Sequence, residues 1–195
     1  MMRYPAEHKE ETRERIVLAA SRRFRRSGAG VGIGALMKVL KLTHGGFYRH
    51  FRSKDELLSE ALMKAFDEMR RRIQRAVEQV PPERKLRTLI ETYLSDAHCA
   101  DAAGGCPIAA LGSEIARYPR AARAIMDRAI HEIASTAARL MPGNSEEERR
   151  QNALVLFSGM AGTLAVARAV EDEQLRRTIL KAARKTYLQA FSKDR

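Results

Sequence analysis

The sequence predicts an all-α protein of about nine helices. Apolar residues recur at intervals of three and four through most of the chain, which is the spacing of one face of a helix. Segments with the alternating pattern of strands are nearly absent, and prolines and glycines separate the helical segments. A chain of 195 residues can bury a core of ordinary size, as one domain or as two small ones.

Each expected helix has its own local signals. In the first, Ile16, Ala20 and Phe24 form a buried stripe, and Gly28 is a suitable C-terminal stop. Pro107 suits the first turn of a helix, and the residue before Pro119 is driven out of the helical region. From these signals we expect helices at about 9–26, 33–40, 43–50, 53–79, 83–100, from 107 to a break at 118–119, 120–140, 145–170 and 173–191.

The short helix expected near residues 43–50 is the most informative element. Thr43 is a good N-cap, and Phe47 and Phe51 lie four residues apart, so both can anchor one helical face in a core. Ser53 and Glu56 have the spacing of a capping box that starts the next helix. Such a helix is too short to stand alone, and it presents a cluster of donors outward. A DNA major groove is its natural target.

At this point the sequence resembles a known family. Residues 42–57, LTHGGFYRHFRSKDEL, are similar to the helix-turn-helix signature of TetR (tetracycline-repressor-like) regulators, with Lys41 at a turn position where the family usually has Gly. The resemblance is strong over about the first quarter of the chain. It implies that the N-terminus of the recognition helix enters the groove and that Tyr48 and Lys54 bind phosphates. The DNA-binding residues expected from it are Thr43, His44, Gly45, Gly46, Tyr48, Arg49 and Lys54.

The positive charge is concentrated in the same segment. The net charge of the chain is +12, and residues 1–54 hold 13 Lys and Arg against 4 Asp and Glu, a net +9. A basic run such as residues 22–26 is by itself most simply a solvated helix face. Together with the helix-turn-helix pattern, however, this distribution is what neutralisation of DNA phosphates requires.

The pattern divides the chain into two parts that share one long helix. We expect a helix-turn-helix DNA-binding domain at residues 1–54 and an effector-binding and dimerisation domain at 55–195. The last two helices are rich in small and apolar residues, which fits a buried core, but the resemblance favours a homodimer through an intermolecular four-helix bundle. The expected dimer residues are Leu154, Phe157, Ser158, Gly159, Ala161, Gly162, Ala165, Ile179 and Tyr187.

A ligand pocket is expected between the helices of the second part. The candidates are Met, Phe and other side chains without fixed charges, which suggests an apolar or aromatic effector. The alternative, that they form only hydrophobic core, will hold for most of them. The candidates are Met63, Phe66, Leu94, His98, Cys99, Cys106, Leu111, Met126, Ile130, Phe157 and Met160.

Cys106 offers a second route to regulation. It occupies the cap position before Pro107, where free backbone N–H groups and the helix dipole favour a thiolate and raise reactivity. The block GGCPIAAL also resembles part of a TetR subgroup, some of whose members sense oxidants or electrophiles. The alternative is a small hydrophobic residue in a core. Zinc held by His98, Cys99 and Cys106 is disfavoured, because the spacing is not a standard ligand pattern.

Other classes of function have little support in the sequence. It contains no phosphate-binding glycine loop, no nucleophile elbow and no HExxH motif, so we expect no enzyme and no cofactor or metal. No apolar run of about 18 residues and no secretory signal are seen, which favours a cytoplasmic protein without a membrane. Three hypotheses remain: a repressor released from a palindromic operator by a small molecule, a repressor switched through Cys106, and a helical enzyme or scaffold that retains the head.

Overall fold

The computed structural model describes residues 6–191, and within that range every regular element is helical. The all-α prediction is confirmed. The elements are α1 (Ala6–Ser27), α2 (Ile33–Val39), α3 (His44–Phe47), α4 (Lys54–Glu78), the 3-10 turn η1 (Pro82–Arg84), α5 (Lys85–Tyr93), α6 (Asp96–Ala100), α7 (Pro107–Ile115), α8 (Arg120–Ala138), α9 (Glu146–Ala169) and α10 (Glu173–Phe191).

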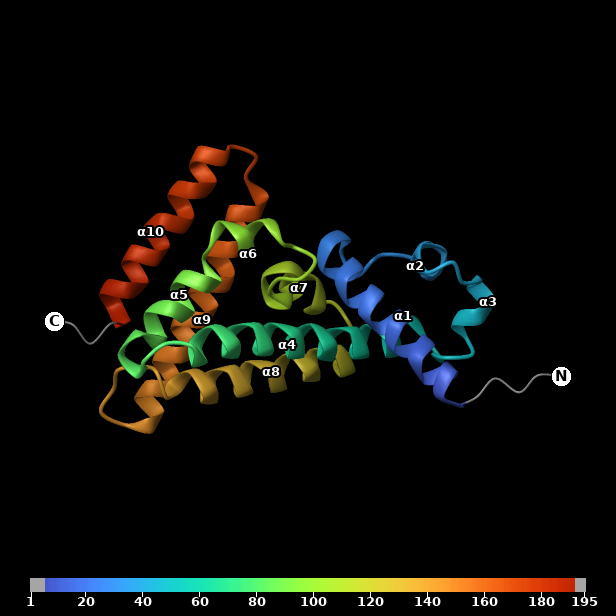
Figure 1. Ribbon diagram of the computed structural model, residues 1–195, viewed down its shortest axis with the longest axis horizontal. Helices are drawn as coiled ribbons and strands as arrows, with labels where there is room; N and C mark the ends of the chain where they lie inside the picture. The colour runs from blue at the N-terminus through green and yellow to red at the C-terminus, as the bar shows by residue number, and fades with distance from the viewer. Residues whose placement is uncertain (1–5, 192–195) are drawn as a thin grey trace.

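Helices α1 to α3 form a head at one end of an elongated molecule (Figure 1). The long helix α4 crosses α1 and continues into the body, where it lies beside α8. Helix α9 packs on α8, and α10 packs on α9 and α5 at the end far from the head. Helix α7 lies between the head and the body and contacts both α1 and α9. Helix α4 is therefore shared by the head and the body.

The core of the head is built from the apolar spacing of its helices. Ile16, Ala20 and Phe24 of α1 are buried, as expected, and so are Phe47 and Phe51. Helix α3 is shorter than the expected helix at 43–50. The Phe47 carbonyl accepts from the N–H groups of His50 and Phe51 at 2.9 and 3.0 Å, so residues 48–50 form a tight turn that places Phe51 in the core.

The serine caps form as the spacing predicts. The Glu56 N–H donates to Ser53 Oγ at 3.1 Å, and the Glu148 N–H donates to Ser145 Oγ at the same distance. The reciprocal bond of a capping box usually runs to the cap residue itself. In both caps here the glutamate carboxylate instead accepts from the N–H one residue earlier, at Arg52 and Asn144.

The single helix expected at 83–100 is wrong. That segment divides into η1, α5 and α6, with the break at Leu94 and Ser95. Ser95 causes the break, because its hydroxyl donates to the Thr92 carbonyl at 2.9 Å and accepts from the His98 N–H at 3.1 Å. Serine competes with the helical backbone for hydrogen bonds in this way, and it restarts the chain as a new N-cap.

Lys41 adopts a backbone conformation that L-residues avoid. Its φ is +56°, in the left-handed region, at the end of α2. The N–H groups of Lys41 and Leu42 donate to the carbonyls of Lys38 and Met37, which is the bonding of a Schellman motif. The turn therefore keeps the geometry that a glycine would give it, at a cost in strain.

Lys41→Gly should relieve this strain. We expect the free energy of unfolding to rise by about 1 kcal/mol, since the left-handed conformation costs a residue with a Cβ about 1–2 kcal/mol and glycine loses some of that gain to chain entropy. Urea denaturation followed by circular dichroism measures the change. Lys41→Ala is the control, because it keeps the Cβ, and a gain in Lys41→Ala equal to that in Lys41→Gly would contradict the explanation.

Helix α9 is long and apolar enough to cross a membrane by length and composition alone. Packing within the protein also accounts for its apolar composition, because seven of its residues are buried against the rest of the chain. Val155, Ser158, Gly162 and Val166 are exposed at spacings of three and four residues, so they form one outward stripe. Helix α9 thus carries two apolar faces, and within residues 6–191 only one of them is covered.

Candidate functional site

The surface of the head that faces solvent is centred on α3. Thr43, His44, Gly45, Tyr48 and Arg49 are all exposed, and Tyr48 is 59% exposed although it is aromatic. The rings of Phe47 and Phe51 lie behind them, stacked with centroids 5.4 Å apart. The anchors and the outward residues thus occupy opposite sides of this segment, as a recognition helix requires.

The N-terminus of α3 is fixed by its cap. Thr43 Oγ1 accepts from the Gly46 N–H at 3.1 Å. A Cβ on Gly46 would lie 3.2 Å from that oxygen, whereas a Cβ on Gly45 would meet nothing within 4 Å. Gly45 therefore leaves open space where DNA could approach the backbone closely, and Gly46 lets the capped turn close.

Two further groups flank this surface. Lys54 is the first residue of α4 and is partly buried, so the start of α4 lies beside the turn that follows α3. The His50 ring is half-buried, its Nδ1 has no hydrogen-bond partner among the described residues, and burial together with Lys9 and Arg13 lowers its pKa. His50 therefore favours the neutral form, which suits a packing residue better than a phosphate ligand.

The body contains a large open cavity between α4, α5, α8 and α9. Its volume is about 1480 Å³, well above the roughly 300–1,000 Å³ of common ligand pockets. The floor is apolar, and the rim carries charges of both signs. The apolar lining includes Phe66, Met69, Ile73, Val77, Leu86, Leu89, Tyr93, Ala129, Ile133, Leu140, Leu156, Phe157 and Met160.

Only part of the expected pocket is brought together. Phe66, Phe157 and Met160 line the cavity, and His98 lines a small recess beside Tyr93. The other candidates lie elsewhere, since Met63 is exposed and the rest pack in the core away from the lining. Those core residues are Leu94, Cys99, Cys106, Leu111, Met126 and Ile130.

The missed lining residues had a signal in the sequence. Phe66, Met69, Ile73 and Val77 are spaced by three, four and four residues, so the inward stripe of α4 continues beyond Met69. The candidate residues carry no fixed charges, whereas the rim of this cavity does. There the cations are Arg70, Arg84, Lys85, Arg87 and Arg139, and the acids are Glu78, Glu83 and Glu132.

Burial opposes the reactivity expected of the Cys106 thiol. Cys106 does occupy the cap before Pro107, and the N–H groups of Ile108 and Ala109 lower its thiol pKa as that position predicts. However, Cys106 is fully buried, and the loss of solvation outweighs these donors, so its pKa is raised. The buried Tyr93 hydroxyl makes no hydrogen bond among the described residues, and burial together with the neighbouring Cys106 thiol raises its pKa.

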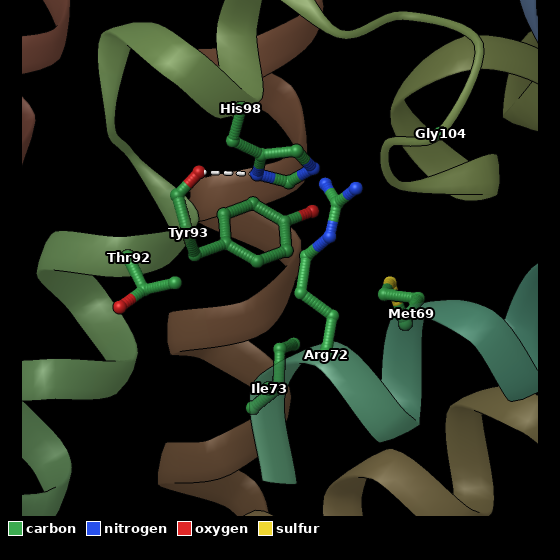
Figure 2. Close-up of a pocket in the computed structure, with 7 residues that line it drawn as sticks. All are labelled: Met69, Arg72, Ile73, Thr92, Tyr93, His98 and Gly104. Atoms are coloured by element: carbon green, nitrogen blue, oxygen red, sulfur yellow. Dashed lines mark hydrogen bonds between the residues drawn. The ribbon is translucent and has the colours of Figure 1, made fainter. Parts of the chain in front are cut away.

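His98 binds the backbone with both ring nitrogens. Its Nδ1 lies 2.6 Å from the Tyr93 carbonyl oxygen, and its Nε2 accepts from the Cys106 N–H at 3.0 Å. Figure 2 shows the Tyr93 ring beside the imidazole, and the two rings meet edge to face with centroids 4.9 Å apart. The imidazole is therefore neutral with its proton on Nδ1, and no ring lone pair is left for a metal.

This arrangement predicts a loss of stability in weak acid. Burial, Arg168 and Arg72 lower the pKa of His98 in the folded chain, while the hydrogen bond to the Tyr93 carbonyl and the charge of Asp101 oppose them. Below pH about 6.5 the unfolded chain takes up a proton that the folded chain resists, so the free energy of unfolding should fall as the pH drops from 7 to 5, by at most about 1.4 kcal/mol per pH unit. Urea denaturation at several pH values measures the slope. His98→Gln should flatten it, and an unchanged slope would exclude His98 as the cause.

The expected dimer residues divide between two environments. Leu154, Ser158 and Gly162 face solvent, and Ala165 is partly exposed. Phe157 and Ala161 are buried among the described residues of their own chain. Gly159 faces Tyr187 of α10, and Ile179 packs on the core. Val155 and Val166 are not in the expected set, but they are 62% and 54% exposed and continue the stripe of Gly162.

Comparisons with known proteins agree with this geometry. Residues 16–61 match the family model described as bacterial regulatory proteins, tetR family. Among the curated proteins, none matches the chain.

Several solved structures share the whole fold. A TetR-family regulator from Chloroflexus aurantiacus has a TM-score of 0.76 and 24% identity, covering 94% of this chain and 96% of that one. One from Cytophaga hutchinsonii has a TM-score of 0.79 and 16% identity, with coverage of 96% and 98%. The reduced form of E. coli NemR has a TM-score of 0.74 and 18% identity, with coverage of 90% and 96%.

The sequence match covers the exposed surface of α3 and the phenylalanines that anchor it. The structural likeness extends through the body to α10. Residues 16–61 thus match the N-terminal segment of the tetR-family regulatory proteins, and the chain as a whole has the fold of solved TetR-family regulators.

Proposed function

We propose that this protein is a homodimeric repressor that binds a palindromic DNA operator and leaves it when a small, mainly apolar or aromatic ligand occupies the body cavity. The observation that carries the proposal is the course of α4. Its first residue, Lys54, follows the recognition segment directly, and its stripe from Phe66 to Val77 lines the cavity. A ligand that displaced this stripe would displace the helix on which the head rests.

The mechanism we propose is a population shift between two spacings of the heads. One spacing places both recognition helices in successive major grooves, and the other does not. A ligand that binds the second form more tightly lowers operator affinity by the ratio of its two affinities. The DNA-binding part is residues 1–54, the regulatory part is residues 55–195, and we place the protein in the cytoplasm.

The cavity supports a bulky or elongated ligand with polar ends. The deep lining is apolar, so it would take the body of the molecule, and the charged residues stand at the rim. Arg84, Lys85 and Arg139 of the rim have no ion-pair partner among the described residues, so each is free to meet a polar or anionic group of a ligand.

Substitutions in the recognition segment test the DNA contacts. Lys54→Ala should weaken binding to all duplexes and lower the slope of log affinity against log salt by about 1, because it removes one phosphate contact. Tyr48→Phe should also weaken binding to all duplexes by the same factor. His44→Ala should change sequence preference instead. Fluorescence anisotropy with a duplex selected from a random library, and with random DNA, measures each. If His44→Ala lost the same factor of affinity on both duplexes, His44 would not be a residue that contacts the bases.

A ligand screen tests the regulatory part. Small apolar and aromatic compounds, with and without an anionic group, are screened for a rise in melting temperature, and each hit is titrated into the complex with the selected duplex. By linkage, a ligand that releases DNA must itself bind more weakly to the DNA-bound protein. Stabilising ligands that leave operator affinity unchanged would contradict release from this cavity.

Release through oxidation of Cys106 is not favoured. The thiol is fully buried and its pKa is raised, whereas sensing cysteines are exposed and have lowered pKa values. The ligand-released repressor is the function that these contacts support best.

A further inference from the structure

Arg25 is a buried charge that joins the head to the body. It lies in the last turn of α1 and is 3% exposed. Its Nε and Nη2 donate to Ser21 O and Oγ on the same helix, both at 3.1 Å. Its Nη1 donates to the Gly105 carbonyl at 2.9 Å, and Nη2 donates to Glu68 Oε2 at 2.6 Å. A buried guanidinium needs all these acceptors, so Arg25 fixes α1 to α4 and to the α6–α7 connection together.

The carbonyl that Arg25 meets is itself held in place. Arg168 of α9 donates to the carbonyl of His98, in α6 just before this connection, at 2.8 Å. Arg72 of α4 bonds to Asp101 at 2.9 Å. A Cβ on Gly105 would lie 2.6 Å from the Asp101 carbonyl oxygen, so only glycine fits there. The Gly105 acceptor is therefore a fixed point of the body and not part of a loose loop.

A second bond joins α1 to the other end of α7. Glu114 Oε2 accepts from the Ala29 N–H at 2.8 Å, just after α1 ends. Gly28 has a φ of +85°, and a Cβ there would lie 2.9 Å from Glu114 Oε1. The C-terminal end of α1 is therefore held at two points. One is Gly105, which precedes α7, and the other is Glu114, in the last turn of α7.

We propose that Arg25 and Glu114 are positioning residues for operator recognition. They fix the angle between head and body, and through it the half-site spacing that the dimer accepts. Near the other end of α1, Arg13 pairs with Glu56 and Glu60 of α4, so a head released at Arg25 would stay attached and pivot. The inference rests on the proposed function, because spacing has a meaning only for a dimer on two half-sites.

Operator spacing provides a test that a purely structural role would not pass. One added base pair moves the second half-site by about 3.4 Å and turns it by about 35°, which a rigid head cannot follow and a pivoting head can. The probes are the duplex selected by the wild type, the same duplex with one base pair inserted or deleted between half-sites, and a single half-site. The variants are Arg25→Met, Glu114→Ala and Glu114→Gln, with Asp127→Ala as a control that removes an exposed carboxylate of α8.

In the wild type and in Asp127→Ala, the altered spacing should reduce affinity at least about tenfold. In Glu114→Ala and Arg25→Met the reduction should shrink to about threefold or less, while half-site affinity stays unchanged. Glu114→Gln should keep the wild-type penalty, because its amide oxygen can still accept from Ala29. If Arg25→Met fails to fold, the spacing penalty measured for Glu114→Ala alone tests the inference.

Two results would overturn the inference. One is an unchanged spacing penalty in the folded Glu114→Ala variant, and the other is an equal loss of affinity on every probe, including the half-site, which would mean damage to the head itself. Failure of the wild type to bind any selected duplex would instead contradict the proposed function and remove the basis of this inference with it.

Discussion

Gly162→Arg is expected to leave each chain folded and to abolish its dimerisation. Gly162 is exposed on α9, and a Cβ at this position would meet no atom within 4 Å of its own chain. In the proposed dimer the stripe of Val155, Gly162 and Val166 packs against its symmetry mate. Two arginines would then be buried opposite each other without acceptors, which is far more costly than the loss of apolar contact alone.

Sedimentation at micromolar concentration measures this change directly. The wild type should be a dimer and Gly162→Arg a monomer with unchanged helical content. Affinity for the selected duplex should fall by at least about a hundredfold, because linking two heads raises the affinity of the pair by about 10²–10⁴. Ala121→Arg places the same side chain on an exposed position of α8 and should change neither property. A monomeric wild type, or a dimeric Gly162→Arg, would be incompatible with the proposed interface.

The head could be predicted from sequence because its signals are local. The spacing of Phe47 and Phe51 fixes a helical face, and the serine caps fix where helices begin. The break at Ser95 was missed for a physical reason. Serine is tolerated within helices. It acts as a cap here because its hydroxyl bonds to the Thr92 carbonyl and the His98 N–H, and these bonds are set by the folded structure and not by the local sequence.

The cavity could be predicted only in part, because helical spacing shows which face is apolar but not what it faces. Phe66 and Leu111 have the same character in the sequence, yet one lines the cavity and the other fills the core. Cys106 shows the same limit more sharply. Its cap position was evident, but the desolvation that reverses its pKa shift comes from neighbours far along the chain. Gly159 and Gly162 also look alike in sequence, and only packing separates them.

Phe47→Ala is expected to unfold the head and to remove operator binding while the body stays helical. Phe47 is fully buried and stacks on Phe51, whose ring lies 4.4 Å from the guanidinium of Arg13. Replacing a buried phenylalanine by alanine costs about 3–5 kcal/mol. Helix α3 has only four residues and cannot persist without its anchors, so this loss should fall on the recognition segment first.

Circular dichroism and anisotropy with the selected duplex separate the two parts of this prediction. Operator affinity should fall by the factor by which the folded fraction of the head falls, because only the folded head binds DNA. Most of the helical signal should remain, because most residues of the buried cluster lie on α4 to α10. Tyr48→Ala, at the exposed neighbouring position, should weaken DNA binding with little loss of stability. If Phe47→Ala bound the duplex within threefold of the wild type, the two phenylalanines could not be what holds the recognition segment in place.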